Sequence, residues 1–283
     1  MQPERKPRDD EIDVYGLSHQ GKVRKENQDH FLLATIHKRL QVVLSSLPEN
    51  HGLPLDDQRI AFLAMVADGV GGGVGGREAS ATAISVATEY VTSSTDCFLQ
   101  DDAAGEQFIE SLQAAALRSH AAVRERAKQQ PEGRSMATTL TLWMGVWPWY
   151  YLLQVGDSRY YLYREGVLTQ VSRDQTMAQE LVDQGVFTRA VAARSRFNNI
   201  LSSAIGSDEA VPVVTRMRSE WGSVHLLCTD GLTKHVSDER IAECLRTMTS
   251  SKQVCEQLLQ EVLDDGGSDN VSIIVGRAVE RPA

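Results

Sequence analysis

The order of strand-like and helical stretches constrains the fold of this 283-residue chain more than any single motif. Short runs rich in Val, Ile, Thr and Tyr are typical of antiparallel strands joined by hairpins. They form two groups, first at residues 13–18, 30–36, 40–44 and 60–67, and then at residues 138–144, 150–155, 159–163, 167–171, 211–217, 223–228 and 271–275. A parallel sheet would instead show strands and helices in regular alternation.

Helical stretches lie between the two groups and near the end of the chain. The first two are expected at about residues 76–92 and 106–128, where small residues and a stripe that includes Phe108 suit packing on a sheet. Three further helices are expected at residues 176–184, 237–247 and 251–263. We therefore predict an α+β sandwich, in which two mostly antiparallel β-sheets pack together and helices cover the outside.

No internal repeat and no linker rich in Pro, Gly or Ser divides the chain, so residues 12–283 are expected to form a single domain. Residues 1–11 are mostly charged, which predicts a flexible tail and not a signal peptide. No apolar run approaches the ~18 residues that a membrane span needs.

The cysteines form no Cys-x-x-Cys pair, which predicts a reduced, cytoplasmic protein. They are Cys97, Cys228, Cys244 and Cys255.

The chain is acidic, with 29 Lys and Arg residues against 38 Asp and Glu residues and a formal net charge of −9. Sequence-independent binding to nucleic acid needs a basic face, so nucleic acid is not an expected partner. Divalent cations are more plausible ligands of an acidic chain than nucleic acid is, provided that some of the carboxylates converge.

Four aspartates stand where an apolar run meets a turn. Asp29 directly precedes such a run, Asp68 and Asp230 each follow one and precede a glycine, and Asp269 precedes Asn270 and another run. A single Asp-Gly pair is an ordinary turn. Several carboxylates at one rim of a core would repel one another and would need cations, and hard oxygen ligands suit Mg²⁺ or Mn²⁺. The placement therefore indicates a divalent metal site.

A glycine-rich loop at residues 68–76 supports a competing interpretation. Gly71, Gly73 and Gly76 match the G-x-G-x-x-G pattern of dinucleotide-binding proteins. The regular strand–helix–strand continuation is missing, however, and Glu89 lies within a helical stretch and not at the end of a second strand. A dinucleotide-binding oxidoreductase therefore remains as an alternative.

Arg24 lies five residues before Asp29, and a planar guanidinium can bind two phosphate oxygens at once. An isolated surface arginine would be the ordinary interpretation. Other nucleophilic chemistries have no support, because the chain has no Cys-x5-Arg loop, no G-x-S-x-G elbow and no H-E-x-x-H helix.

Taken in order, these motifs resemble the PPM family, the metal-dependent type 2C serine/threonine protein phosphatases, and most of all its bacterial members. The segments that carry the resemblance are residues 21–29, 66–72, 136–140, 155–161, 172–185, 228–232 and 268–272. The resemblance implies an αββα sandwich with a binuclear metal centre at one end of the sheets.

The resemblance also implies the ligands of two Mn²⁺ or Mg²⁺ ions. Asp68 would bridge both ions, Asp230 and Asp269 would complete the shell of one, and Asp29 and the carbonyl of Gly69 would hold the other. A hydroxide bridging the ions would attack the phosphorus of phosphoserine or phosphothreonine.

Further roles follow from the same resemblance. Arg24 would bind the substrate phosphate, Asp157 would help to hold a third, weaker metal, and residues of about 176–210 would form a flap beside the active site. The partners would be a phosphorylated signalling protein and, indirectly, the serine/threonine kinase that it opposes. The protein would act as a monomer. A non-catalytic, metal-dependent phosphoprotein-binding module is the main alternative.

The chain departs from the common family pattern at three positions. Gly73 stands where a His is frequent, Ala137 replaces a Gly, and Gln175 begins a pair that replaces His-Ser. These changes concern protonation of the leaving group and the surroundings of the flap more than the metal ligands.

Overall fold

A computed structural model describes residues 5–39, 41–42, 58–70, 74–94, 104–129 and 136–281. Most of the strand expected at residues 40–44 lies outside these ranges, as do Cys97, Gly71 and Gly73. None of the helices in the described part of the chain has a stretch long and apolar enough to cross a membrane.

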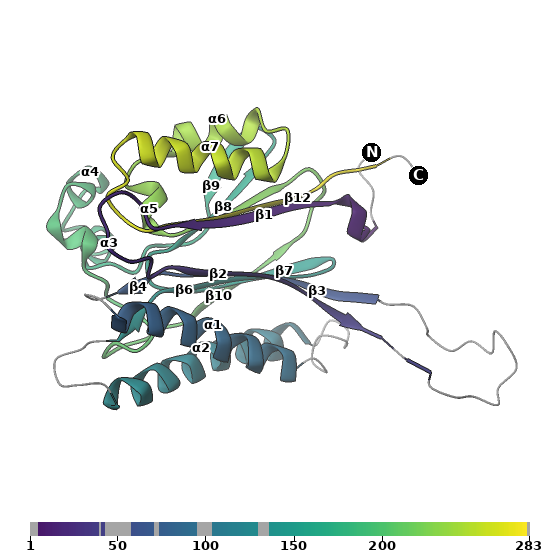
Figure 1. Ribbon diagram of the computed structural model, residues 1–283, viewed down its shortest axis with the longest axis horizontal. Helices are drawn as coiled ribbons and strands as arrows, with labels where there is room; N and C mark the ends of the chain where they lie inside the picture. The colour runs from purple at the N-terminus through teal and green to yellow at the C-terminus, as the bar shows by residue number, and fades with distance from the viewer. Residues whose placement is uncertain are drawn as a thin grey trace, which may run out of the picture.

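Two five-stranded sheets form the middle of the molecule, and both are antiparallel throughout (Figure 1). Sheet I has the strand order β1 (Ile12–His19), β12 (Val271–Ala278), β11 (Val224–Cys228), β8 (Arg159–Arg164) and β9 (Val167–Gln170). Sheet II has the order β10 (Val213–Arg218), β7 (Trp149–Val155), β6 (Leu140–Val146), β3 (Gln58–Ala67) and β2 (His30–Lys38). The short strands β4 (Gly69–Val70) and β5 (Ala137–Thr138) pair with each other.

Helices cover the outer faces of both sheets, so the predicted αββα sandwich is confirmed. In Figure 1, α1 (Val74–Ser93) and α2 (Ala104–Lys128) lie below sheet II, and α6 (Asp238–Arg246) and α7 (Ser251–Asp264) lie above sheet I. Shorter elements complete the chain, namely η1 (Asp9–Glu11), α3 (Met177–Asp183), α4 (Arg189–Ala193), η3 (Arg196–Asn199) and α5 (Asp230–Thr233).

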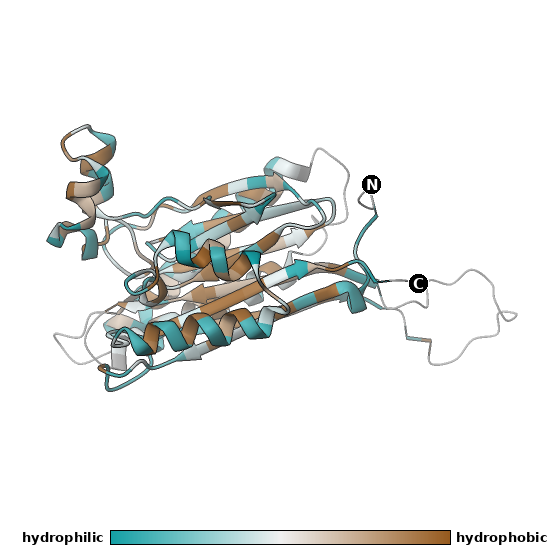
Figure 2. Ribbon diagram, turned by 90° about the horizontal axis from the view of Figure 1, so that it is seen from above, coloured by the Kyte–Doolittle hydropathy of each residue, from teal (hydrophilic) through white to brown (hydrophobic). Residues whose placement is uncertain are grey.

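The sequence of β3 shows why the strands stay in the middle. Leu63 and Met65 pack into the core under α1 and α2, while Ala64 and Val66 pack into the core between the sheets. A strand that is covered on both faces needs apolar residues at consecutive positions. In Figure 2 the strands between the helices are accordingly mostly brown, whereas the helices over them alternate brown and teal.

The arrangement of β3 also argues against the dinucleotide-binding alternative. Both neighbours of β3, namely β2 and β6, run antiparallel to it. A dinucleotide fold needs a parallel strand–helix–strand unit at this point. The glycine-rich loop that follows β3 therefore belongs to a different architecture.

Residues 5–11, the described part of the segment that we expected to be a tail, contact distant parts of the chain. The carboxylate of Glu11 is fully buried and accepts two hydrogen bonds of 2.6 Å from the guanidinium of Arg5. Arg59 of β3 forms an ion pair of 2.7 Å with Asp9, and Trp221 donates to the backbone carbonyl of Arg5. Buried charges must be paired, so residues 5–11 are held by partners that lie far away in the sequence.

Candidate metal centre

The strand register brings the four predicted aspartates to one end of the sandwich. His30 lies opposite Ala67 in the pairing of β2 with β3, so Asp29 and Asp68 stand at the same edge of sheet II. In sheet I, β11 ends next to the beginning of β12, which places Asp230 and Asp269 at its corresponding edge.

Hydrogen bonds across the sandwich join these two edges. Asp29 precedes a strand of sheet II, yet its Oδ2 accepts from the hydroxyl of Thr229, which directly follows β11, at 2.8 Å, and from that of Ser272 in β12 at 3.0 Å. The same Thr229 hydroxyl accepts from the backbone N–H of Ser272 at 2.9 Å. The carboxylate of Asp29 is therefore fixed in position by the opposite sheet.

The electrostatics of Asp68 show that the carboxylates converge. Burial raises the pKa of Asp68 well above its ordinary value. The negative charges of its neighbours raise it further, and these neighbours are Asp29, Asp230, Asp157 and Asp269. Every aspartate predicted as a metal ligand is thus close enough to oppose the ionisation of Asp68.

Asp29 and Asp157 are also protonated more readily than ordinary aspartates. Burial raises the pKa of Asp29 to about 7, against the hydrogen bonds from Thr229 and Ser272, which lower it. Burial likewise raises the pKa of Asp157 to about 7, and the charges of Asp230 and Asp174 add to this effect. Like charges that are crowded out of water produce such shifts, and a cation among them reverses the shifts.

Two carboxylate oxygens test whether a hard cation fits this centre. Oδ1 of Asp29 and Oδ1 of Asp230 are buried, and neither has a hydrogen-bond partner among the described residues. A buried polar atom without a partner is unfavourable by about 1–3 kcal/mol or more. Carboxylate oxygens are the donors that Mg²⁺ and Mn²⁺ prefer, so the residues present fit these ions.

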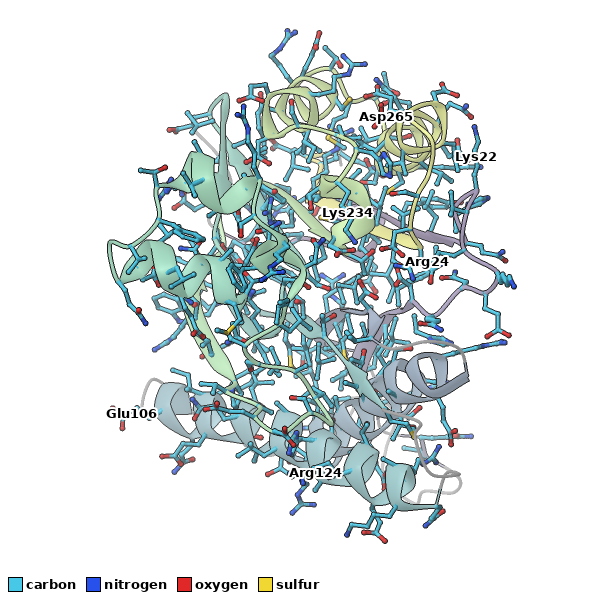
Figure 3. All side chains as sticks on the ribbon, turned by 90° about the vertical axis from the view of Figure 1, so that its left-hand side faces the viewer. Lys22, Arg24, Glu106, Arg124, Lys234 and Asp265 are labelled. Carbon is cyan, nitrogen blue, oxygen red and sulfur yellow. The ribbon has the colours of Figure 1, made fainter. Side chains whose placement is uncertain are left out.

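Basic side chains contact two of these carboxylates. In the described ranges, no three Asp, Glu, His or Cys side chains are arranged around one point as metal ligands. The ammonium of Lys234 instead lies 2.6 Å from Oδ2 of Asp230 and 2.7 Å from Oδ2 of Asp269. Arg24 binds both oxygens of Asp269, with its Nε 2.6 Å from Oδ1 and its Nη2 2.8 Å from Oδ2. Figure 3 shows Arg24 and Lys234 near each other at this end of the molecule.

The glycines after Asp68 and Asp230 allow backbones to pack closely around the centre. A Cβ at Gly69 would lie 2.3 Å from the carbonyl oxygen of Gly76, and one at Gly231 would lie 1.8 Å from that of Asn270. Both distances are far shorter than a carbon–oxygen contact, so only glycine fits. The glycine after each aspartate thus lets another stretch of backbone approach the strand end that carries the carboxylate.

Sequence reasoning missed the residues that position Asp68. The hydroxyl of Thr139 accepts from the backbone N–H of Asp68 at 2.9 Å and lies 2.7 Å from the hydroxyl of Ser158. Thr138 donates through its side chain to the carbonyl of Asp68 at 2.8 Å. Both threonines lie in residues 136–140, one of the segments that carry the family resemblance, and that motif is the signal in the sequence that points to them.

Asn270 is a second positioning residue that sequence reasoning missed. Its side-chain amide donates to the carbonyls of Gln20 and Glu26, at 2.8 and 2.9 Å, and its Oδ1 accepts from the N–H of Gln28. One side chain therefore fixes the loop that carries Arg24. The Asp-Asn pair at residues 269–270 was the available signal.

Asp157 lies in the turn from β7 to β8, where the chain crosses from sheet II to sheet I. Gly156 makes this turn possible with a φ of 103°. The side chain of Gln175 accepts from the N–H of Gly156 at 2.7 Å and donates to the carbonyl of Val211 at 2.9 Å. Gln175, which we identified as a departure from the family pattern, thus joins both ends of residues 176–210 to the turn that carries Asp157.

A two-sheet sandwich between helical layers, with aspartates of both sheets gathered at one end, defines the class of αββα metal-dependent phosphatase folds. The sequence profile of the family Protein phosphatase 2C matches residues 52–265. This chain therefore belongs to the protein phosphatase 2C family. Arg24, Asp29 and Asp269 lie outside the matched residues, and the fold brings them to Asp68 and Asp230.

Known relatives agree with this assignment. The chain is 33% identical over 220 residues to the serine/threonine protein phosphatase PstP of Mycobacterium tuberculosis, an alignment that covers 78% of this chain and 41% of PstP. The chain therefore spans about two fifths of the length of this curated relative. The crystal structure of the M. tuberculosis phosphatase PstP/Ppp superimposes with a TM-score of 0.75 at 29% identity, covering 95% of this chain and 99% of that one. A structure of the PstP catalytic domain with two manganese ions gives a TM-score of 0.73 at 28% identity, and it also covers 95% of this chain and 99% of that one.

Proposed function

We propose that this protein hydrolyses phosphoserine and phosphothreonine in proteins and uses two Mn²⁺ or Mg²⁺ ions. The observation that carries the proposal is the convergence of Asp29, Asp68, Asp230 and Asp269 at one end of the sandwich, with two buried carboxylate oxygens that have no hydrogen-bond partner among the described residues. The family supports it, because the PstP catalytic domain, which shares this fold, was crystallised with two manganese ions.

The proposed division of roles follows the positions of the side chains. Asp68 would be shared by both ions, Asp230 and Asp269 would hold one of them, and Asp29 and the carbonyl of Gly69 would hold the other. When bound, the ions supply the positive charge that lowers the pKa of a water molecule and stabilises negative charge on the phosphate. Asp157, whose carboxyl is buried beside Asp230, would contribute to a third, weaker site.

Arg24 is proposed to bind the substrate phosphate. Its side chain is 52% exposed and lies at the rim of the acid cluster, where its guanidinium now binds Asp269. A phosphate can replace a carboxylate as partner, because both present two oxygens to the same planar group. Arg24 would then orient the phosphorus over the acid cluster and stabilise the charge on its oxygens.

We propose further that residues 12–283 act as a single catalytic domain and that residues of about 176–210 form a flap beside the site. The position of α3, α4 and η3 at the acidic end of the sandwich supports this proposal (Figure 1). The proposed partner is a phosphorylated protein, with a serine/threonine kinase acting in opposition. We also propose a cytoplasmic location and a monomeric state.

Phosphate release from a phosphothreonine peptide tests the proposal. We expect release in the presence of Mn²⁺, none in excess EDTA, and at least about a hundredfold less with Asp68→Asn than with the native protein. An exposed aspartate on the same protein, Asp208, provides the matched control Asp208→Asn. Full manganese-dependent activity in Asp68→Asn would contradict the assignment. A protein that binds the peptide in the presence of Mn²⁺ but releases no phosphate would be the non-catalytic module.

A further inference from the structure

Lys234 contacts two of the proposed metal ligands at once. It directly follows α5 and comes four residues after Asp230, so both side chains lie on the same face of this helical turn. Its Nζ lies 2.6 Å from Oδ2 of Asp230 and 2.7 Å from Oδ2 of Asp269. Figure 3 places Lys234 near the middle of the end face that holds the acid cluster, with Arg24 beside it.

The position of this ammonium conflicts with that of an ion bound by the same two oxygens. Mg²⁺ binds carboxylate oxygens at about 2.0–2.1 Å. An ammonium that contacts both Oδ2 atoms at 2.6 and 2.7 Å would then lie within a few ångströms of a divalent cation. Asp230 and Asp269 are mostly buried, with 23% and 13% of their side chains exposed, so water screens this repulsion poorly.

Arg24 differs from Lys234 in its position and its exposure. Its guanidinium binds both oxygens of Asp269, whereas the ammonium of Lys234 lies between Asp269 and Asp230. The side chain of Arg24 is 52% exposed, against 32% for Lys234. An ion held by both carboxylates would therefore displace Lys234 most directly, because its ammonium lies between them.

We propose that Lys234 is a built-in competitor for the metal ion that Asp230 and Asp269 share. The inference rests on the proposed metal centre. In the metal-free protein the lysine neutralises both carboxylates and holds them together. When the ion binds, the ammonium of Lys234 leaves the space between the two carboxylates. The affinity for this one ion is therefore lower than the carboxylates alone would give.

The substitution Lys234→Met tests the competition, because it removes the charge and keeps the length of the side chain. Calorimetric titration of Mn²⁺ into metal-free protein should show the competed ion bound at least about tenfold more tightly. Thermal unfolding in EDTA should show the opposite sign, with a lower midpoint for Lys234→Met, because Asp230 and Asp269 then repel each other. The conservative variant Lys234→Arg keeps a cation and should retain the weaker affinity.

Lys252→Met is the matched control. Lys252 is 61% exposed on α7 and lies 3.7 Å from Glu256 in an ordinary surface pair, so its loss should change neither measurement. Unchanged or weaker Mn²⁺ binding by Lys234→Met would overturn the proposal.

The variants Asp230→Asn and Asp269→Asn separate this failure from a failure of the proposed function. If both bind two Mn²⁺ ions as the native protein does, the metal centre itself is misplaced and the competition fails with it. If both lose one ion while Lys234→Met binds as the native protein does, only the role of Lys234 is wrong.

Discussion

The substitution Asp29→Asn is expected to stabilise the metal-free protein while it weakens metal binding. The carboxyl of Asp29 is 3% exposed, and burial raises its pKa from 3.8 to about 7. A shift of this size corresponds to roughly 4 kcal/mol of unfavourable free energy for the ionised form in the folded protein. Asn removes the charge and keeps an oxygen that can accept from Thr229 and Ser272.

The size of the effect depends on pH. Because the folded protein has the higher pKa, the favourable contribution of protonated Asp29 is fully present below about pH 4 and is lost as the pH rises through about 7. We expect Asp29→Asn to raise the free energy of unfolding by roughly 2–4 kcal/mol at about pH 8 and to change it little at about pH 4.

Urea unfolding followed by tryptophan fluorescence, in EDTA and at both pH values, measures this difference. In excess Mn²⁺ the order should reverse, because the native protein gains more stability from ion binding than the variant does. Asp208→Asn, at an exposed position, serves as the control. If Asp29→Asn were no more stable than the native protein at about pH 8 in EDTA, the account of Asp29 as a strained, buried carboxylate would be wrong.

Two further predictions concern the same centre. Thr139→Val should weaken Mn²⁺ binding by about 10- to 100-fold in a calorimetric titration, because the backbone N–H of Asp68 loses its 2.9 Å acceptor; unchanged affinity would show that Thr139 does not position Asp68. Mn²⁺ affinity should rise at least about tenfold between pH 6 and pH 8, because burial holds the pKa of Asp29 and Asp157 at about 7 and both must lose a proton. Titrations in two buffers of different ionisation enthalpy should detect the protons released, and affinity that stays constant with pH would contradict the raised pKa values.

The parts of the site that the sequence predicts are local in the chain. Asp68 and Asp230 each follow an apolar run and precede a glycine, so a few neighbouring residues suffice to place them at the end of a strand. The two-sheet architecture was predictable for a similar reason, because hairpin spacing and the position of the long helices are visible along the chain. The structure confirms these expectations at α1, which begins two residues before its expected start, and at β12.

The parts that the sequence does not predict depend on register and packing between distant segments. Thr229 and Ser272 bind Asp29 across separations of 200 and 243 residues, and no local pattern marks either residue as a partner. Lys234 combines both cases. Its spacing from Asp230 indicates an ordinary i,i+4 pair, but its contact with Asp269 exists only because β11 and β12 are neighbours.

The division of the acid cluster between two sheets links metal binding to the core between them. Asp29 and Asp68 are attached to sheet II, and Asp230 and Asp269 are attached to sheet I, so their separation depends on how far apart the sheets lie. Large side chains set that distance, among them Tyr150 and Tyr160, which are 1% and 0% exposed in the inter-sheet core. Protein interiors are close-packed and transmit small changes in volume. The geometry of the proposed centre is therefore set by the packing of the whole sandwich, and a cation that shares carboxylates from both sheets would also hold the two sheets together at this end.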